Sequence, residues 1–260
     1  MTNRITKFRQ LFILAMLLNI LSQGIHESGH WAIYQAYDRG PVWGFIGLVQ
    51  LSDTPPLHPD GWVPISSSDG SQSWFRLASA AVTKTEKALE AAGGPLASLL
   101  GAVMCLVLAY RSKNTPIKQM ALMLALLISL VMALYYLRSP MRTGGDEIEL
   151  AALLGVSRGW IEIPFAVTFV VCLIVGLRLL ANWRERGKWL GAALIGSMVT
   201  GLLVNQVDGL VRSQVNLGNP IFQPVLGVSL PVLVTYFVVV LLLAMFWLIL
   251  SRSQISENKI

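Results

Sequence analysis

Two histidines and a glutamate near the amino terminus carry the clearest chemical pattern in this sequence. They belong to the pentapeptide His26-Glu27-Ser28-Gly29-His30. Residues four apart lie on one face of a helix, one turn from each other, so both imidazole rings can reach one ion. This spacing is typical of zinc sites in which the glutamate takes a proton from water instead of binding the metal. The sequence therefore predicts one Zn²⁺ per chain, bound by His26 and His30, with Glu27 as the catalytic base.

A hydrolytic zinc site needs a third protein ligand and an open fourth position. We favour Asp146, because two preceding glycines would let the backbone approach the histidines closely. An alternative is that Asp146 caps the helix predicted over Glu147–Leu154, and Glu147 and Glu149 are reserve ligands. The third histidine of the chain, His58, lies in a proline-rich stretch and is expected to be solvated.

The composition predicts the environment of this motif. Hydrophobic residues make up 54% of the 260 residues and charged residues only 13%, whereas soluble domains contain about a quarter charged residues. The net charge of +6 comes from basic residues in short segments between apolar runs, which is how membrane proteins set their orientation. We therefore expect the lipid bilayer as a partner and no nucleic acid. Cys105 and Cys172 lie in apolar runs and are expected to be free thiols.

Six segments are long and apolar enough to cross a membrane as helices. These predicted spans are approximately Phe8–Tyr34, Gly94–Tyr110, Gln119–Leu137, Pro164–Leu180, Trp189–Val204 and Leu230–Leu250. The predicted fold class is an all-α polytopic membrane protein, with residues 1–260 as one domain. Within it we expect an extracytoplasmic hairpin and loop region at 37–93, the second to fourth spans at 94–180, and two C-terminal spans at 181–260. The first span could also be read as a signal peptide, but no small-x-small cleavage site follows it.

Basic residues concentrate at the amino terminus and in alternate connections, so the positive-inside rule places both termini in the cytoplasm. Asp38–Gly93, Arg138–Ile163 and Asn205–Ser229 would then face outward. His26 lies fifteen residues after Leu11, or about 22 Å into a hydrocarbon core of about 30 Å, in its outer half.

Four segments outside the spans have distinct patterns. Gly40–Gln50 is apolar, glycine-rich and too short to span, which predicts a hairpin or re-entrant strand. Asp53–Ser73 is predicted to be an exposed loop, and Trp74–Glu90 a short helix near the membrane surface. Asn205–Gly227 is predicted to be an outward loop that either gates access or simply connects two spans.

On these residues the chain resembles the site-2 protease family of intramembrane zinc metalloproteases, over roughly residues 8–155. Besides the histidine motif, Ala92–Leu100 looks like the Gly-Pro-leading helix of that family. The Gly-Gly-Asp stretch ending at Asp146 looks like a variant of its aspartate motif. Gly40–Gln50 is similar to its membrane-associated β-hairpin.

The resemblance implies hydrolysis of peptide bonds in membrane protein substrates, within or beside the bilayer. It implies Asp146 as the third zinc ligand and Gly94, Pro95 and Ser98 as substrate-binding residues. Two differences indicate a divergent branch. Ser139-Pro140 stands where the family has Asn-Pro before the aspartate, and Ser98 where it often has asparagine.

Other functions remain open from the sequence. The altered aspartate motif favours a non-catalytic binding protein or chaperone that retains the protease fold, although such a protein would not need Glu27. A membrane zinc protease of another kind would use Glu147 or Glu149 as third ligand. A transporter has the least support, since the later spans contain few charged residues and no paired broken helices. The sequence predicts no oligomeric state.

Overall fold

The computed structural model contains six helices long and apolar enough to cross a membrane in its described residues, which are 8–37, 51–52, 55, 62–66, 72–76, 83–216, 221, 224–225 and 228–257. The spanning helices are α1 (Phe8–Ala36), α2 (Lys84–Arg111), α3 (Thr115–Leu137), α5 (Gly159–Arg178), α6 (Trp183–Asn216) and α7 (Leu230–Glu257). Two short helices, η1 (Ser139–Met141) and α4 (Asp146–Leu154), connect α3 to α5. The prediction of a multi-pass helical membrane protein is thus confirmed.

A small antiparallel sheet lies in the connection between α1 and α2. It consists of β1 (Leu51–Ser52), β2 (Trp62–Ser66) and β3 (Gln72–Arg76) in the order β1-β3-β2. A second pair, β4 (Pro224–Val225) and β5 (Val228–Ser229), precedes α7. The predicted hairpin over Gly40–Gln50 lies outside the described residues.

The sheet and α2 correct two of our expectations. The expected loop Asp53–Ser73 contains β2, whose apolar residues pair with β3 despite the surrounding turn-forming residues; Val63, for example, lies opposite Phe75. The expected surface helix Trp74–Glu90 is also wrong, because its first residues belong to β3 and its last ones to α2. A capping box between Thr83 and Glu86 starts α2 at Lys84, well before the apolar run.

The fifth spanning helix is longer than expected. Residues Asn205–Asn216 continue α6 beyond its apolar part, Trp183–Val207. The expected loop Asn205–Gly227 is therefore helical over its first half. The polar residues that suggested a loop only mark where the helix leaves the apolar region.

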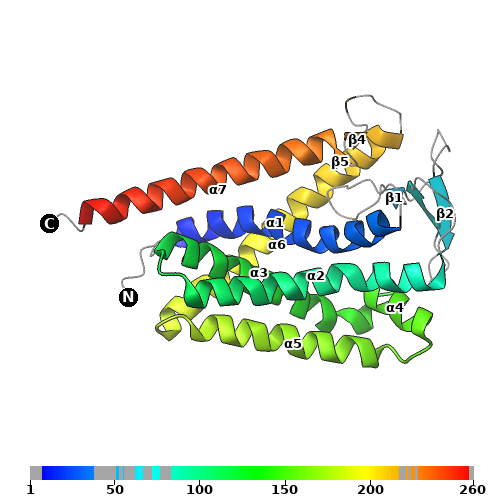
Figure 1. Ribbon diagram of the computed structural model, residues 1–260, viewed down its shortest axis with the longest axis horizontal. Coiled ribbons are helices and arrows are strands. Elements are labelled where there is room, and N and C mark those ends of the chain that lie inside the picture. Colours follow the sequence, from blue (N-terminus) through cyan, green and yellow to red (C-terminus); the bar gives the residue numbers. More distant parts are fainter. Residues whose placement is uncertain are drawn as a thin grey trace.

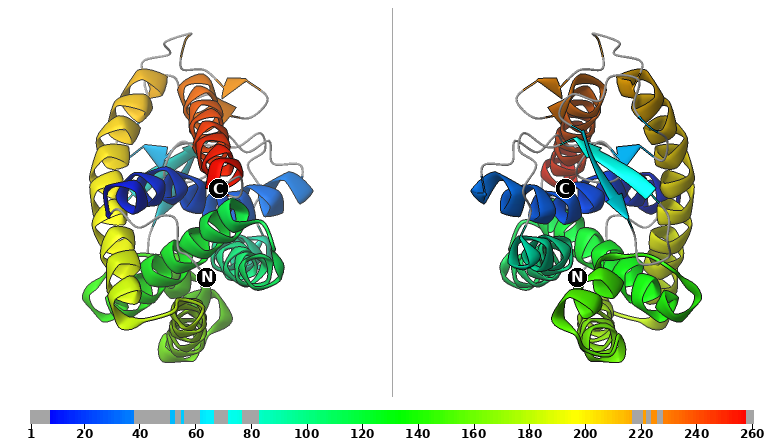
Figure 2. Two further views of the ribbon diagram at one scale, coloured as in Figure 1. Left: turned by 90° about the vertical axis from the view of Figure 1, so that its left-hand side faces the viewer. Right: turned by 90° about the vertical axis from the view of Figure 1, so that its right-hand side faces the viewer.

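Helix α3 is the central helix of the bundle. It contacts α1, α2, α5, α6 and α7, and most of its apolar stretch is buried, unlike that of α5 or α7. Its Leu122 and Leu126 pack in a core with Leu11, Leu14 and Trp189. The two end-on views of Figure 2 show the other helices arranged around it.

The ends of the bundle differ in what they contain. Helix α1 begins and α7 finishes at the same end, on the left of Figure 1. The strands and α4 lie at the opposite end. The connections that we expected to share one face of the membrane therefore do lie on one side, and the histidine motif of α1 is close to them.

Candidate metal centre

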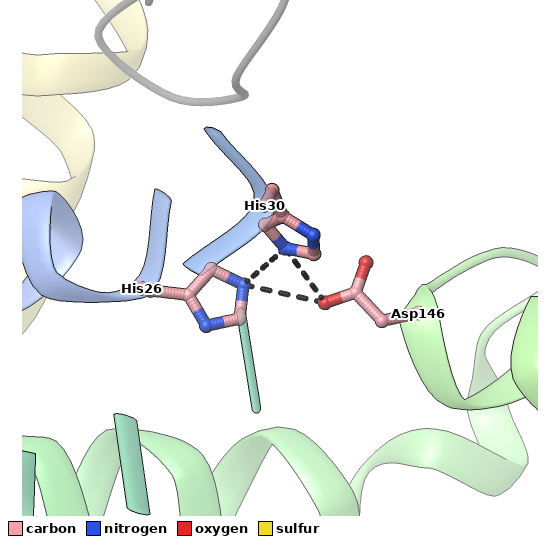
Figure 3. Close-up of side chains that lie close together, drawn as sticks. All are labelled: His26, His30 and Asp146. Carbon is pink, nitrogen blue, oxygen red and sulfur yellow. Dashed lines mark hydrogen bonds and ion pairs between the residues drawn. The ribbon is translucent and has the colours of Figure 1, made fainter. Parts of the chain in front are cut away.

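The histidine pair lies on α1 as its spacing predicts. His26 and His30 are one turn apart, and their Nε2 atoms are separated by 3.2 Å. Both side chains are largely covered, with 18% of His26 and 6% of His30 exposed. Figure 3 shows the two rings converging on one point in front of α1.

Asp146 completes this group from a different part of the chain. Its Oδ2 lies 3.3 Å from Nε2 of His26 and 3.4 Å from Nε2 of His30 (Figure 3). Asp146 is the first residue of α4, and the N-cap position belongs to Gly145, without a side-chain capping bond. The alternative that Asp146 caps α4 is therefore wrong. Gly145 has φ 147° and ψ 162°, a conformation open essentially to glycine alone.

The three ligand atoms have the separations that a zinc site requires. Zinc with bonds of about 2.0–2.1 Å in tetrahedral geometry keeps its ligand atoms roughly 3.3–3.4 Å apart. The separations here are 3.2, 3.3 and 3.4 Å. His26, His30 and Asp146 are also the one group of three candidate metal ligands found in the described part of the chain. The residues therefore fit a zinc ion with three protein ligands.

The other ring nitrogens bind to α2, and these contacts orient the imidazoles. Nδ1 of His30 lies 2.7 Å from the backbone oxygen of Glu90 and 3.2 Å from its carboxylate. Both partners accept hydrogen bonds, so this nitrogen carries a proton and donates it. Nδ1 of His26 lies 3.0 Å from the hydroxyl of Ser98. Partners of this kind turn the free Nε2 lone pairs of metal-binding histidines towards the ion.

This arrangement implies a positive charge between the ligands. With Nδ1 protonated, Nε2 of a neutral imidazole is an acceptor, and at His30 it faces a carboxylate oxygen 3.4 Å away. Electron pairs held this close repel each other unless a proton or a metal ion lies between them. The separations of the three ligand atoms would fit a metal ion in that position.

Glycines of α2 make room for the histidines. A β-carbon at Gly94 would lie 2.1 Å from Nε2 of His30 and 2.7 Å from Nε2 of His26. Gly94, Pro95 and Ser98, which the sequence analysis assigned to substrate binding, are all buried. Gly94 and Ser98 directly contact the histidine pair, and their role towards a substrate stays a prediction.

Glu27, the expected base, is 5% exposed and lies on α1 between the two histidines in sequence. Tyr236 of α7 also reaches this part of α1. The Tyr236 hydroxyl lies against α1 one turn earlier, 2.9 Å from where a β-carbon of Gly24 would be. The sequence analysis missed Tyr236, because no local pattern connects a tyrosine in the last span with a glutamate in the first.

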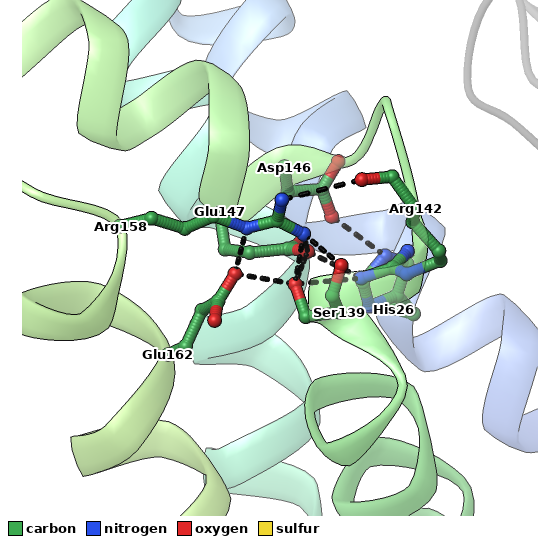
Figure 4. Close-up of polar contacts among 7 residues, drawn as sticks. All are labelled: His26, Ser139, Arg142, Asp146, Glu147, Arg158 and Glu162. Atoms are coloured by element: carbon green, nitrogen blue, oxygen red, sulfur yellow. Dashed lines mark hydrogen bonds and ion pairs between the residues drawn. The ribbon is translucent and has the colours of Figure 1, made fainter.

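The reserve ligands do not join the metal group. Glu147 points away from it and is fully buried among Ser139, Arg142 and Arg158 (Figure 4). The Ser139 hydroxyl lies 2.6 Å from Oε1 of Glu147, and Arg142 forms an ion pair with the same oxygen. Glu149 is exposed on α4. His58 lies outside the described residues.

The cluster around Ser139 fixes the position of α4. Arg158, at the start of α5, forms an ion pair with Glu162 and donates to both the backbone oxygen and the hydroxyl of Ser139. Its Nη1 also donates to the backbone oxygen of Arg142 at 3.2 Å. Together with Glu147, these contacts connect η1, α4 and α5. They hold Glu147, and hence the adjacent Asp146, in place.

The pKa values of Asp146 and Glu149 shift in opposite directions, as expected if Asp146 and not Glu149 belongs to the histidine group. Burial favours the neutral form of Asp146, but His30 and His26 outweigh that effect and hold the pKa of Asp146 well below its usual range. The pKa of Glu149 is raised by burial and by the charges of Glu90 and Asp146. Asp146 is therefore the ionised carboxylate of α4 that faces the two histidines.

Comparisons with protein-family models, with curated proteins and with solved structures returned no match.

Proposed function

We propose that this protein is a zinc-dependent endopeptidase that cleaves membrane proteins within or beside the bilayer, a divergent relative of the site-2 protease family. The proposal is carried by one observation: the ligand atoms of His26, His30 and Asp146 lie 3.2–3.4 Å apart, with Glu27 beside the first ligand. A purely structural zinc site is closed by four ligands and has no use for Glu27.

The chemistry follows from the groups present. Zinc would supply a Lewis acid that polarises the scissile carbonyl and makes a water molecule acidic. Glu27 would take the proton of that water and pass it to the leaving amine. Ser98 and Glu90 would keep both imidazole rings in the orientation that ligation needs.

Orientation and substrate contact belong to the same proposal. The charge distribution favours cytoplasmic termini, which would put the metal centre in the outer half of the bilayer. The apolar segment Gly40–Gln50 would act as a strand that pairs with an extended substrate. Cleavage that continues unchanged after this segment is exchanged for an unrelated linker would rule that role out.

Zinc content tests the proposal without a known substrate. Metal per chain is measured in detergent-purified wild type and in the variants His26→Ala, Asp146→Ala and Glu27→Gln. We expect about one zinc in wild type and in Glu27→Gln, and almost none in the two ligand variants. Glu27→Gln would then retain substrates uncleaved.

The same experiment separates the main alternative. If metal-loaded wild type holds no zinc, the protease proposal fails, and a non-catalytic binding protein or chaperone takes its place. If Asp146→Ala keeps its zinc while Glu147→Ala or Glu149→Ala loses it, the site belongs to another class of membrane zinc protease.

A further inference from the structure

A second site lies on the same face of α1 as the histidines. Asn19, Gln23, His26 and His30 follow each other at intervals of four, three and four residues, which places them in one line along the helix. Asn19 and Gln23 lie deep within the apolar span. A buried amide without hydrogen-bond partners destabilises the protein there, so polar residues at such positions usually have a function.

These two amides line a cleft of about 480 Å³ between α1, α3 and α6. This volume is within the range of roughly 300–1,000 Å³ that is usual for ligand sites. Its other walls include Leu134 of α3 and Leu194 and Met198 of α6. Leu134, Leu194 and Met198 are 37%, 38% and 61% exposed, so the cleft opens on the surface that faces lipid.

Asn19 indicates that the cleft receives a polar ligand. The residue is 1% exposed, and its side-chain oxygen has no hydrogen-bond partner within the described residues. A buried acceptor left without a partner destabilises the folded protein, so a ligand that donates to it would be bound favourably. A second cavity, of about 530 Å³ between α1, α2, α3 and α7, is by contrast lined almost entirely by apolar side chains such as Leu21 and Met120, and suits a lipid chain.

We propose that the cleft with Asn19 and Gln23 binds an extended segment of a membrane-protein substrate next to the scissile bond. An unwound segment in lipid exposes peptide N–H and C=O groups that have lost their helical partners. A carboxamide offers both a donor and an acceptor, so Asn19 and Gln23 replace those partners. The distance along α1 from Asn19 to His26 is about 10 Å, enough for about three extended residues.

This inference rests on the proposed protease function, and its test keeps the two apart. The probe is a dye-labelled apolar peptide whose central Gly-Pro pair prevents helix formation. The control peptide has Ala-Leu in place of Gly-Pro and is helical. Binding in micelles is followed by fluorescence anisotropy in zinc-loaded Glu27→Gln protein, with and without Asn19→Leu and Gln23→Leu. Leu21→Ala, in the apolar cavity, is the control variant.

We expect the extended peptide to bind more tightly than the helical one. The two leucine substitutions together should weaken its binding on the order of tenfold, from the loss of two hydrogen bonds. Leu21→Ala should leave binding unchanged. The melting temperature of Asn19→Leu should stay the same or rise, because the variant removes an unsatisfied buried acceptor. A merely structural amide would instead make that variant less stable.

Each outcome is assigned to one of the two proposals. If the leucine variants bind the extended peptide as wild type does, the cleft proposal is overturned, whereas zinc content and cleavage still support the protease. If wild type binds no zinc but holds the extended peptide in an Asn19-dependent way, the protease proposal fails and the cleft remains a peptide-binding site.

Discussion

The backbone of Gly93 in α2 lies directly against that of Gly29 in α1. A β-carbon at Gly29 would be 2.1 Å from the carbonyl oxygen of Gly93, closer than any side chain could be. Helices approach this closely only through small residues. The contact brings the histidine face of α1 within reach of Glu90 and Ser98, so the helix crossing itself positions the two histidines of the candidate metal centre.

Alanine at Gly94 should remove the metal without changing a ligand. Its methyl group would occupy the space next to Nε2 of both histidines, 2.1 Å from that of His30. We expect zinc per chain to fall from about one to near zero. Gly209→Ala is the matched control, because a β-carbon there meets no atom within 4 Å. Full zinc content in Gly94→Ala would contradict the proposed position of the ion.

Ser98→Ala should weaken zinc binding while the helix stays intact. The change removes the hydrogen-bond partner of Nδ1 of His26, and loss of such a partner typically costs roughly 10–100-fold in metal affinity. Competition with a chromogenic chelator measures the dissociation constant. Ser129→Ala tests the specificity of the effect, because the Ser129 hydroxyl is also buried and has no partner among the described residues. Equal affinities in both variants would argue against a role for Ser98.

Gly145→Ala should be much more harmful than Gly144→Ala. Gly145 has a positive φ, and a β-carbon there would lie 2.6 Å from the Tyr135 hydroxyl, whereas one at Gly144 meets no atom within 4 Å. Backbone strain of this kind costs about 1–3 kcal/mol and would displace Asp146. We expect a lower melting temperature and weaker zinc binding for Gly145→Ala alone. Similar behaviour of both variants would count against the arrangement of this turn.

Glu147→Gln should destabilise the protein, and Glu149→Gln should not. Glu147 is fully buried and paired with Arg142; breaking such a pair typically costs about 3–5 kcal/mol. The Glu149 side chain reaches solvent, but partial burial of its carboxyl group raises its pKa, as do the charges of Glu90 and Asp146. Its charge therefore opposes folding above its normal pKa, so glutamine should leave thermal stability unchanged or slightly higher. Thermal unfolding at neutral pH distinguishes the two, and equal midpoints would refute the distinction.

Local sequence patterns predicted the features that depend on neighbouring residues. The spacing of His26 and His30 needs only the helical period, and the spans need only long apolar runs. The start of α2 could also have been predicted from the sequence, because Thr83 and Glu86 have the spacing of a capping box. We instead started the second span at Gly94, where the apolar run begins, and assigned Trp74–Glu90 to a separate surface helix.

The remaining features depend on which helices meet. Nothing near Glu90 or Ser98 in the sequence shows that these residues face the histidines, because that contact follows from the Gly29–Gly93 crossing. The ion pairs of Glu147 likewise require α5 to return beside α4. The sequence favoured Asp146 over Glu147 and Glu149, and these contacts add the reason, because Glu147 is already engaged with Arg142 and Ser139.

The division of the ligands between α1 and α4 also affects how the protein is made. A ribosome delivers His26 and His30 to the membrane with the first span, and synthesises Asp146 only after the third. Until then the nascent chain has two of the three ligands that a hydrolytic zinc site requires. Under the proposed function, the site and its hydrolytic activity would therefore form only after α4 has been synthesised.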